Sequence, residues 1–95
     1  GRADQAAKVK GMFVRPEQVA QLANRHAEIS RIRLTITHDG SQDQMIVHIE
    51  GAANAEQIYA DSVRDILKLR GQIEIVAKDS LPNDGMVIDD QRTPG

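Results

Sequence analysis

A small α+β domain is the fold class that this sequence predicts, with the element order βαββαβ and two helices packed on one face of a small antiparallel sheet. Three observations support it. Some segments alternate apolar and polar residues, as strands do; others carry apolar residues at helical spacing; and the two kinds alternate along the chain. Ninety-five residues suffice for one core, so we expect a single domain over residues 1–95.

The first elements are expected between residues 8 and 25. Residues 8–14 form a strand or a tight hairpin around Gly11. Pro16 suits the first position of a helix, where its missing N–H is not needed. Val19 and Leu22 then share one face of that helix.

Two central strands follow. "SRIRLTITHDG" and "QMIVHIEG" each alternate, and "HDGSQD" between them is typical of a turn. Each strand should therefore have one wet face and one buried face. The residues predicted to face the core are Ile32, Leu34, Ile36, Met45, Val47 and Ile49.

The second helix has signals at both ends. Asn54 can cap its N-terminus, and Gly71 lies where a left-handed C-terminal residue is common. "QIEIVAKD" is the last predicted strand, and residues 80–95 form a loop and tail. The apolar stripe of this helix is expected to comprise Ile58, Tyr59, Ser62, Val63, Ile66 and Leu67.

Composition excludes several classes of function. No apolar run approaches the ~20 residues of a membrane span, and no signal peptide is visible, so we expect no membrane contact. The absence of Cys favours a cytoplasmic setting. RNA-binding modules of the same element order need aromatic residues on the sheet, but the only two aromatic residues are Phe13 and Tyr59, so we expect no nucleic acid. The net charge of −2 divides into +4 over residues 1–38 (seven Lys/Arg, three Asp/Glu) and −6 over residues 39–95 (five against eleven).

No self-contained active site is predicted. Asp61 and Asp65 stand one helical turn apart, but Arg64 and Lys68 lie beside them, which favours a solvated charged face. The histidines lie on three different elements without the spacing of metal ligands, so we interpret them as surface or hydrogen-bonded residues: His26, His38 and His48.

The opening stretch, "GRADQAAKVKGMFVRPEQV", resembles the hinge and following strand of acyl-adenylate-forming CoA ligases of the AMP-binding superfamily. There a Gly-Arg-x-Asp is followed by a Lys and then a Gly, before a helix that starts at a Pro. With "LPNDG" near the end, the sequence is most similar to the phenylacetate-CoA ligase group, from Gly1 to about Arg92. The resemblance implies the mobile C-terminal domain of such a ligase, with an N-terminal hinge over residues 1–7.

For the parent enzyme the resemblance implies an acid–thiol ligase of phenylacetate catabolism that can form a homodimer. A larger N-terminal domain, outside this sequence, would bind ATP, Mg²⁺ and an aryl acid and make the acyl-adenylate. The small domain would then rotate so that CoA can attack. The 95 residues alone should fold, bind none of these ligands by themselves and show no ligase activity.

The resemblance also assigns roles to individual residues. Asp4 matches the hinge position, where a short polar side chain tolerates unusual backbone angles. Gly11 matches a glycine of the strand that enters the active site for thioester formation, where a Cβ would obstruct the pantetheine arm. Lys8, Lys10 and Arg15 would hold CoA phosphates. The structural alternatives are a hairpin glycine and solvated cations.

One departure from the family pattern concerns the last loop. The family usually has a Lys just after a Gly there, and its cation stabilises the charge that develops during adenylation. This chain has Met86 after Gly85, and methionine carries no charge. Either Lys78 or a group of the other domain takes that role, or adenylation is weakened.

A second function remains open on the sequence alone. The same element order occurs in stand-alone ferredoxin-like or ACT-like regulatory domains that sense a small molecule. Such domains bind through backbone and loop contacts and leave little trace in a sequence.

Overall fold

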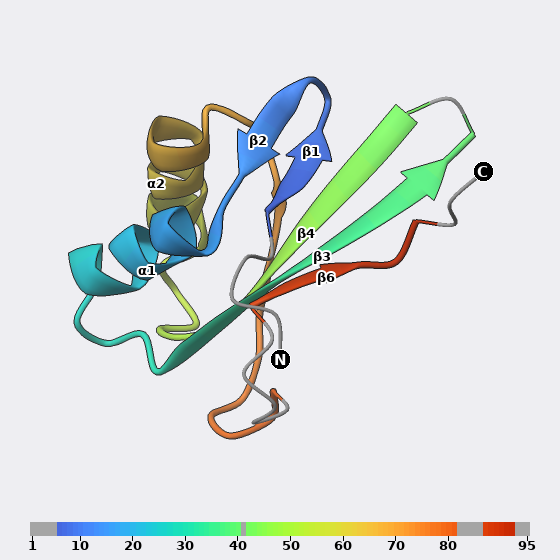
Figure 1. Cartoon of the computed structure of the whole chain (residues 1–95). Coiled ribbons are helices and arrows are strands. Elements are labelled where there is room, and N and C mark those ends of the chain that lie inside the picture. Colours follow the sequence, from blue (N-terminus) through green and yellow to red (C-terminus); the bar gives the residue numbers. More distant parts are fainter. Residues whose placement is uncertain (1–5, 41, 82–86, 93–95) are drawn as a thin grey trace.

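The computed structural model describes residues 6–40, 42–81 and 87–92. It confirms the α+β class: two helices lie on one side of a four-stranded sheet, and a short hairpin lies beside them (Figure 1). Among the described residues, neither helix has the length and apolar character needed to cross a membrane.

The centre of the sheet is an antiparallel pair of long strands, β3 (Arg31–Asp39) and β4 (Gln42–Glu50). They are paired over their full lengths, from Arg31 opposite Glu50 to Asp39 opposite Gln42. The predicted alternation is confirmed, because all six core-facing residues are at most 7% exposed: Ile32, Leu34, Ile36, Met45, Val47 and Ile49.

The outer strands run parallel to their neighbours. β5 (Gln72–Ile75) pairs with β4, and β6 (Ile88–Asp90) pairs with β3, so the strand order is β5-β4-β3-β6. The sheet is therefore mixed, which corrects the expectation of an antiparallel sheet. β6 also lies within residues 80–95, which were predicted to be loop and tail, and the observed order of elements is ββαββαββ, not βαββαβ. A helix lies between β4 and β5, and such a crossover returns the chain to its starting end, so that the next strand is parallel.

Residues 8–14, predicted to be a strand or a tight hairpin around Gly11, lie in a hairpin that stands apart from the main sheet. β1 (Ala7–Val9) and β2 (Met12–Val14) form their own two-stranded antiparallel sheet. Its turn is Lys10-Gly11, with φ of 50° and 84°. Positive φ at both central residues defines the type I′ turn that matches the twist of a two-residue hairpin.

The helices are α1 (Pro16–Arg25) and α2 (Glu56–Leu67), and Pro16 begins α1 as predicted. Three details of α2 differ from the prediction. Its N-cap residue is Ala55, not Asn54, and no side chain caps it. The left-handed residue at its end is Lys68, with φ of 61°. Ile58 is 57% exposed, whereas the other predicted stripe residues are buried or partly buried.

Gly71 has a different role from the predicted one. It is not among the residues with positive φ. A Cβ at this position would lie 2.9 Å from Cε of Met45 and 3.1 Å from Cγ2 of Val47. The glycine therefore allows the chain to pass close to β4 as it enters β5.

The core lies between the sheet and the layer formed by helices and hairpin. The hairpin contributes Ala7, Val9 and Val14 to the same apolar cluster as the sheet. The largest side chains buried within it are Tyr59, Leu22, Leu34, Ile36, Ile49 and Leu67.

The corrected position of Ile58 can be tested by stability. Ile58→Ala should change the free energy of unfolding by no more than about 0.5 kcal/mol, as at other exposed sites. Leu67→Ala, on the buried face of the same helix, should cost about 2–5 kcal/mol. Urea unfolding measures both, and similar costs would contradict this packing of α2.

Candidate functional site

The hairpin brings together four of the residues that the resemblance singled out. Lys8, Lys10, Gly11 and Arg15 are all exposed. The first three lie on β1 and its turn, and Arg15 follows β2 as the N-cap residue of α1. Gln18 of that helix accepts a hydrogen bond from the Arg15 backbone N–H at 2.9 Å, which fixes the backbone but leaves the guanidinium outside.

Phe13 belongs to the same surface, and the sequence prediction did not assign it a role. It lies opposite Lys8 in the hairpin and is 54% exposed, beside Met12 at 41%. The Lys8 Nζ lies 5.8 Å and the Arg15 Cζ 5.7 Å from the centre of its ring. The two cations interact with the aromatic ring at these distances. The signal available in the sequence was the position of Phe13 in the second half of a predicted hairpin, where it would lie across from Lys8.

Gly11 is required by the conformation of the turn. Its φ of 84° is rarely adopted by residues with a Cβ, although a Cβ built there meets nothing within 4 Å in this domain. The hairpin alternative is therefore confirmed. Close approach to a pantetheine arm concerns a ligand outside the domain and stays a prediction.

A second candidate region surrounds Lys78, in a turn between β5 and β6. Lys78 is exposed, and Asp79 beside it has a φ of 67°. The turn is held by Glu50, a carboxylate at the end of β4 that is only 2% exposed. Glu50 accepts hydrogen bonds from the backbone N–H groups of Asp79 and Leu81, both at 3.0 Å. Arg31 donates to the Leu81 carbonyl at 3.1 Å.

These bonds lower the pKa of Glu50. The largest cause is the N–H of Asp79, opposed by desolvation; the N–H of Leu81 and the charges of Arg31 and Lys78 add to the lowering. Glu50 is therefore an anionic anchor for the turn that carries Lys78.

The hairpin and the Lys78 turn are not brought together. In Figure 1 the hairpin lies near one end of the sheet and the chain around residue 78, drawn in orange, at the other. Asp4 and Met86 lie outside the described residues.

The histidines are hydrogen-bonded in three separate places, as interpreted. His26 Nε2 lies 2.7 Å from Ser62 Oγ, and His38 Nδ1 lies 3.1 Å from Asp43 Oδ1. His48 lies between two partners, with 3.0 Å to Thr35 Oγ1 and 2.9 Å to Glu74 Oε1. Among residues 6–40, 42–81 and 87–92, no three His, Cys, Asp or Glu side chains are grouped so that they could hold a metal ion.

The predicted charged face of α2 is also present. Asp65 forms an ion pair with Arg25 of α1 at 2.9 Å, and both side chains are well exposed, at 63% and 45%. Asp61 accepts a hydrogen bond from Gln57 at 3.0 Å. The region is a solvated helix face and not a carboxylate site.

Solved structures share this fold. A domain of phenylacetate-coenzyme A ligase from Bacteroides vulgatus ATCC 8482 has a TM-score of 0.86 and 20% identity, over 100% of both chains. 2-Hydroxyisobutyryl-CoA ligase, in complex with 2-HIB-AMP and CoA in the thioesterification state, has a TM-score of 0.82 and 21% identity over 97% of this chain. An open conformation of that ligase with the same ligands has a TM-score of 0.73 and 16% identity over 95% of this chain.

This chain spans only 22% of the length of the 2-hydroxyisobutyryl-CoA ligase chains. No protein-family model and no curated protein matches the sequence. The likeness confirms the fold that the resemblance implied, that of a small domain found in acyl-CoA ligases.

The anchor at Glu50 predicts a pH dependence of stability. Because its folded-state pKa lies below the ordinary value of 4.5, the carboxylate stabilises the fold above that pH. The contribution is lost as the pH falls below 4.5 and through the folded-state pKa. Glu50→Gln should lower the urea midpoint at pH 7 and flatten its decline as the pH falls below 4.5.

The matched control is Glu17→Gln, which removes an exposed carboxylate from the first turn of α1. It should leave most of the acid decline in place. Parallel pH profiles for the wild type and Glu50→Gln would contradict the anchor.

Proposed function

We propose that this chain is the mobile C-terminal domain of a CoA ligase for an aryl acid of the phenylacetate type. The parent would carry a larger N-terminal domain that binds ATP with Mg²⁺ and the acid and forms the acyl-adenylate. The observation that carries the proposal is the exposed hairpin, which has Lys8 on its first strand, Lys10 and Gly11 in its turn and Arg15 directly after its second strand, on a fold shared with acyl-CoA ligases.

The hairpin suits the thioester step. CoA carries several phosphates and a narrow pantetheine arm. The exposed cations of Lys8, Lys10 and Arg15 would bind the phosphates, Lys as a point charge and Arg as a fork. Gly11 places bare backbone at the tip, so the arm can pass without meeting a side chain. Phe13 adds an exposed apolar surface between two of the cations.

The Lys78 turn suits the other half-reaction. A cation held near the reacting carboxylate and α-phosphate would stabilise the charge that develops there. Lys78 is exposed on a turn whose backbone is fixed by Glu50. Since this turn and the hairpin lie at different ends of the domain, each would face the active centre in a different orientation of the domain (Figure 1).

The likeness to the 2-hydroxyisobutyryl-CoA ligase supports the proposal that this chain is a domain of a CoA ligase, since that ligase was solved in complex with 2-HIB-AMP and CoA. The TM-score is 0.82 for its thioesterification state and 0.73 for its open conformation. No comparable observation favours the small-molecule sensor.

The role of Gly11 can be separated from its conformation. Asn tolerates positive φ, so Gly11→Asn should keep the turn while adding a side chain at the tip. In the parent enzyme, CoA transfer from supplied acyl-adenylate should fall by about a hundredfold, because a displaced reacting group costs that much. Pyrophosphate exchange, which reports adenylation, should be unchanged.

Gly40→Asn is the matched control. Gly40 also has positive φ, 67°, and a Cβ there also meets nothing within 4 Å, but it lies outside the hairpin. It should leave both half-reactions intact. Equal loss of both half-reactions in Gly11→Asn would contradict the thioester role.

Lys78 is tested in the exchange assay. If it supplies the missing cation, Lys78→Ala should slow pyrophosphate exchange by about a hundredfold or more, with CoA transfer from supplied acyl-adenylate unchanged. Met86→Lys should then change little. The reverse pattern, a gain from Met86→Lys and no loss from Lys78→Ala, would assign the role to the last loop.

A further inference from the structure

The hairpin poses a physical problem, because little holds its tip in place. Its two strands have three residues each and, over the described ranges 6–40, 42–81 and 87–92, pair only with one another. An isolated two-stranded hairpin of this kind is marginal in water. Ala7, Val9 and Val14 are buried and attach its base to the core, but apolar contacts are not directional. The direction of the tip therefore depends on hydrogen bonds.

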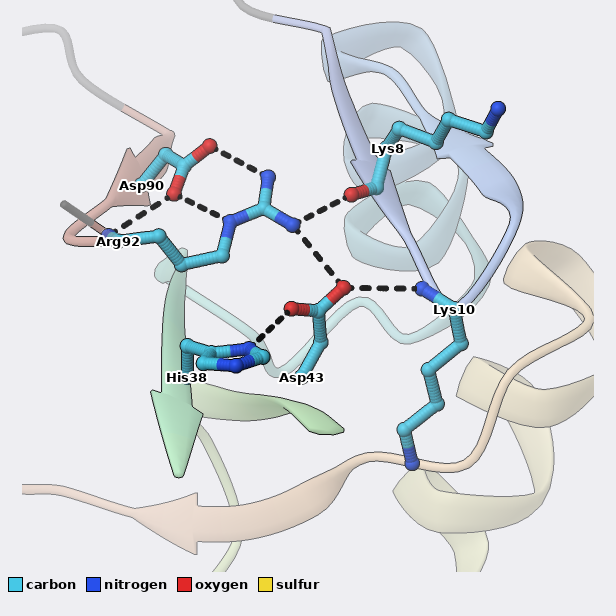
Figure 2. Close-up of polar contacts among 6 residues, drawn as sticks. All are labelled: Lys8, Lys10, His38, Asp43, Asp90 and Arg92. Carbon is cyan, nitrogen blue, oxygen red and sulfur yellow. Dashed lines mark hydrogen bonds and ion pairs between the residues drawn. The ribbon is translucent and has the colours of Figure 1, made fainter. Parts of the chain in front are cut away.

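Within the part of the chain that the structure describes, two side chains from distant segments contact the hairpin backbone. Asp43 of β4 accepts a hydrogen bond from the Lys10 N–H at 3.3 Å. Arg92, which follows β6, donates from Nη1 to the Lys8 carbonyl at 2.6 Å. Figure 2 shows the guanidinium and the carboxylate against the hairpin backbone, while the side chains of Lys8 and Lys10 extend away from them.

The two anchoring side chains also bind each other. Arg92 Nη1 lies 3.0 Å from Asp43 Oδ2, and the side chains are only 23% and 20% exposed. A pair this shielded is less screened than a surface pair. The same nitrogen thus serves both Asp43 and the hairpin carbonyl, so that β4, the segment after β6 and the hairpin meet at one guanidinium.

Contacts with neighbouring groups hold this pair in place independently of the hairpin. Asp90 binds Arg92 as a fork, at 2.8 Å to Nε and 2.6 Å to Nη2, and His38 lies 3.1 Å from the other oxygen of Asp43. The backbone N–H of Gln91 donates to the Ile36 carbonyl at 2.8 Å, which ties the segment to β3. A bidentate fork orients a guanidinium more strictly than a single contact does.

The charges of the pair are stable. The pKa of Asp43 is lowered, first by His38, then by the Lys10 N–H and by Arg92. The pKa of Arg92 is raised, chiefly by Asp90. Both groups therefore remain ionised near neutral pH.

We propose that Arg92 and Asp43 are positioning residues for the thioester step, because together they hold the hairpin tip in the orientation that Gly11 and the cations need. This inference rests on the proposed function. The pair contacts hairpin backbone and not substrate, so it acts through the hairpin. Without it the tip would spend part of its time in other orientations, and transfer would fall in proportion to the population that is lost.

The first test uses the 95-residue chain and does not depend on any activity. Asp43→Ala, which removes the acceptor of the Lys10 N–H, should speed amide hydrogen exchange at Lys10 by about tenfold or more, since hydrogen bonds to charged groups are worth about that factor. Exchange in the β3–β4 core should stay as in the wild type. Unchanged exchange at Lys10, or an equal increase throughout the core, would overturn the inference.

The second test measures the half-reactions of the parent enzyme. Arg92→Ala should lower kcat for CoA transfer from supplied acyl-adenylate by about tenfold and leave pyrophosphate exchange unchanged. Arg92→Lys keeps the charge but loses the two-pronged contact of the guanidinium, so its kcat for CoA transfer should lie between those of Arg92→Ala and the wild type. Arg25→Ala is the matched control. It breaks the ion pair between Arg25 and Asp65, whose charged atoms lie 2.9 Å apart and which does not contact the hairpin backbone, so it should alter neither half-reaction.

The outcomes separate this inference from the proposed function. If Gly11→Asn impairs transfer and Arg92→Ala does not, the positioning role is wrong and the proposed function stands. If neither variant impairs transfer, the proposed function fails, and the positioning role fails with it.

Discussion

The fold depends on the ladder between β3 and β4, which are paired without interruption along their whole lengths. The ladder supplies six core side chains from one face, and each of its edges accepts a further strand. A shift of either strand by one residue would turn its three core side chains outward, so the register is strongly specified. Both helices and the hairpin cover this same face (Figure 1).

The parts of the fold that the sequence predicted are those set by periodicity. The alternation of apolar and polar residues identified β3, β4 and their buried faces. Successive side chains of a strand point to opposite faces of the sheet, so the apolar set has to face the core when the other face meets water. The start of α1 followed from Pro16. What the sequence missed depends on partners distant along the chain. Gly71 is placed by the approach to Met45, the direction of β5 by the helical crossover that precedes it, and β6, which was predicted to be loop, by its pairing with β3.

The candidate sites show the same division. The hairpin around Gly11 was visible in the sequence, but its anchors were not. Arg92 is 84 residues from Lys8, and Glu50 is 29 residues from Asp79, so no local pattern links them. The burial of Tyr59 was predicted, but not that its hydroxyl accepts from the Ala52 N–H and donates to Glu28, at 2.9 and 2.6 Å. Such contacts are fixed only once the ladder has brought the segments together.

One strand carries the anchors of both candidate regions. Asp43, near the start of β4, contacts the hairpin, and Glu50, at its end, holds the Lys78 turn. Seven residues of extended strand separate the two anchors by roughly 23 Å at about 3.3 Å per residue. β4 is paired with β3 along its whole length and with β5 from Ile46 to Ile49, so this spacing is not easily changed. If both regions serve one active centre, as we propose, the domain cannot bend to deliver them together; it has to turn as a rigid body between the two half-reactions.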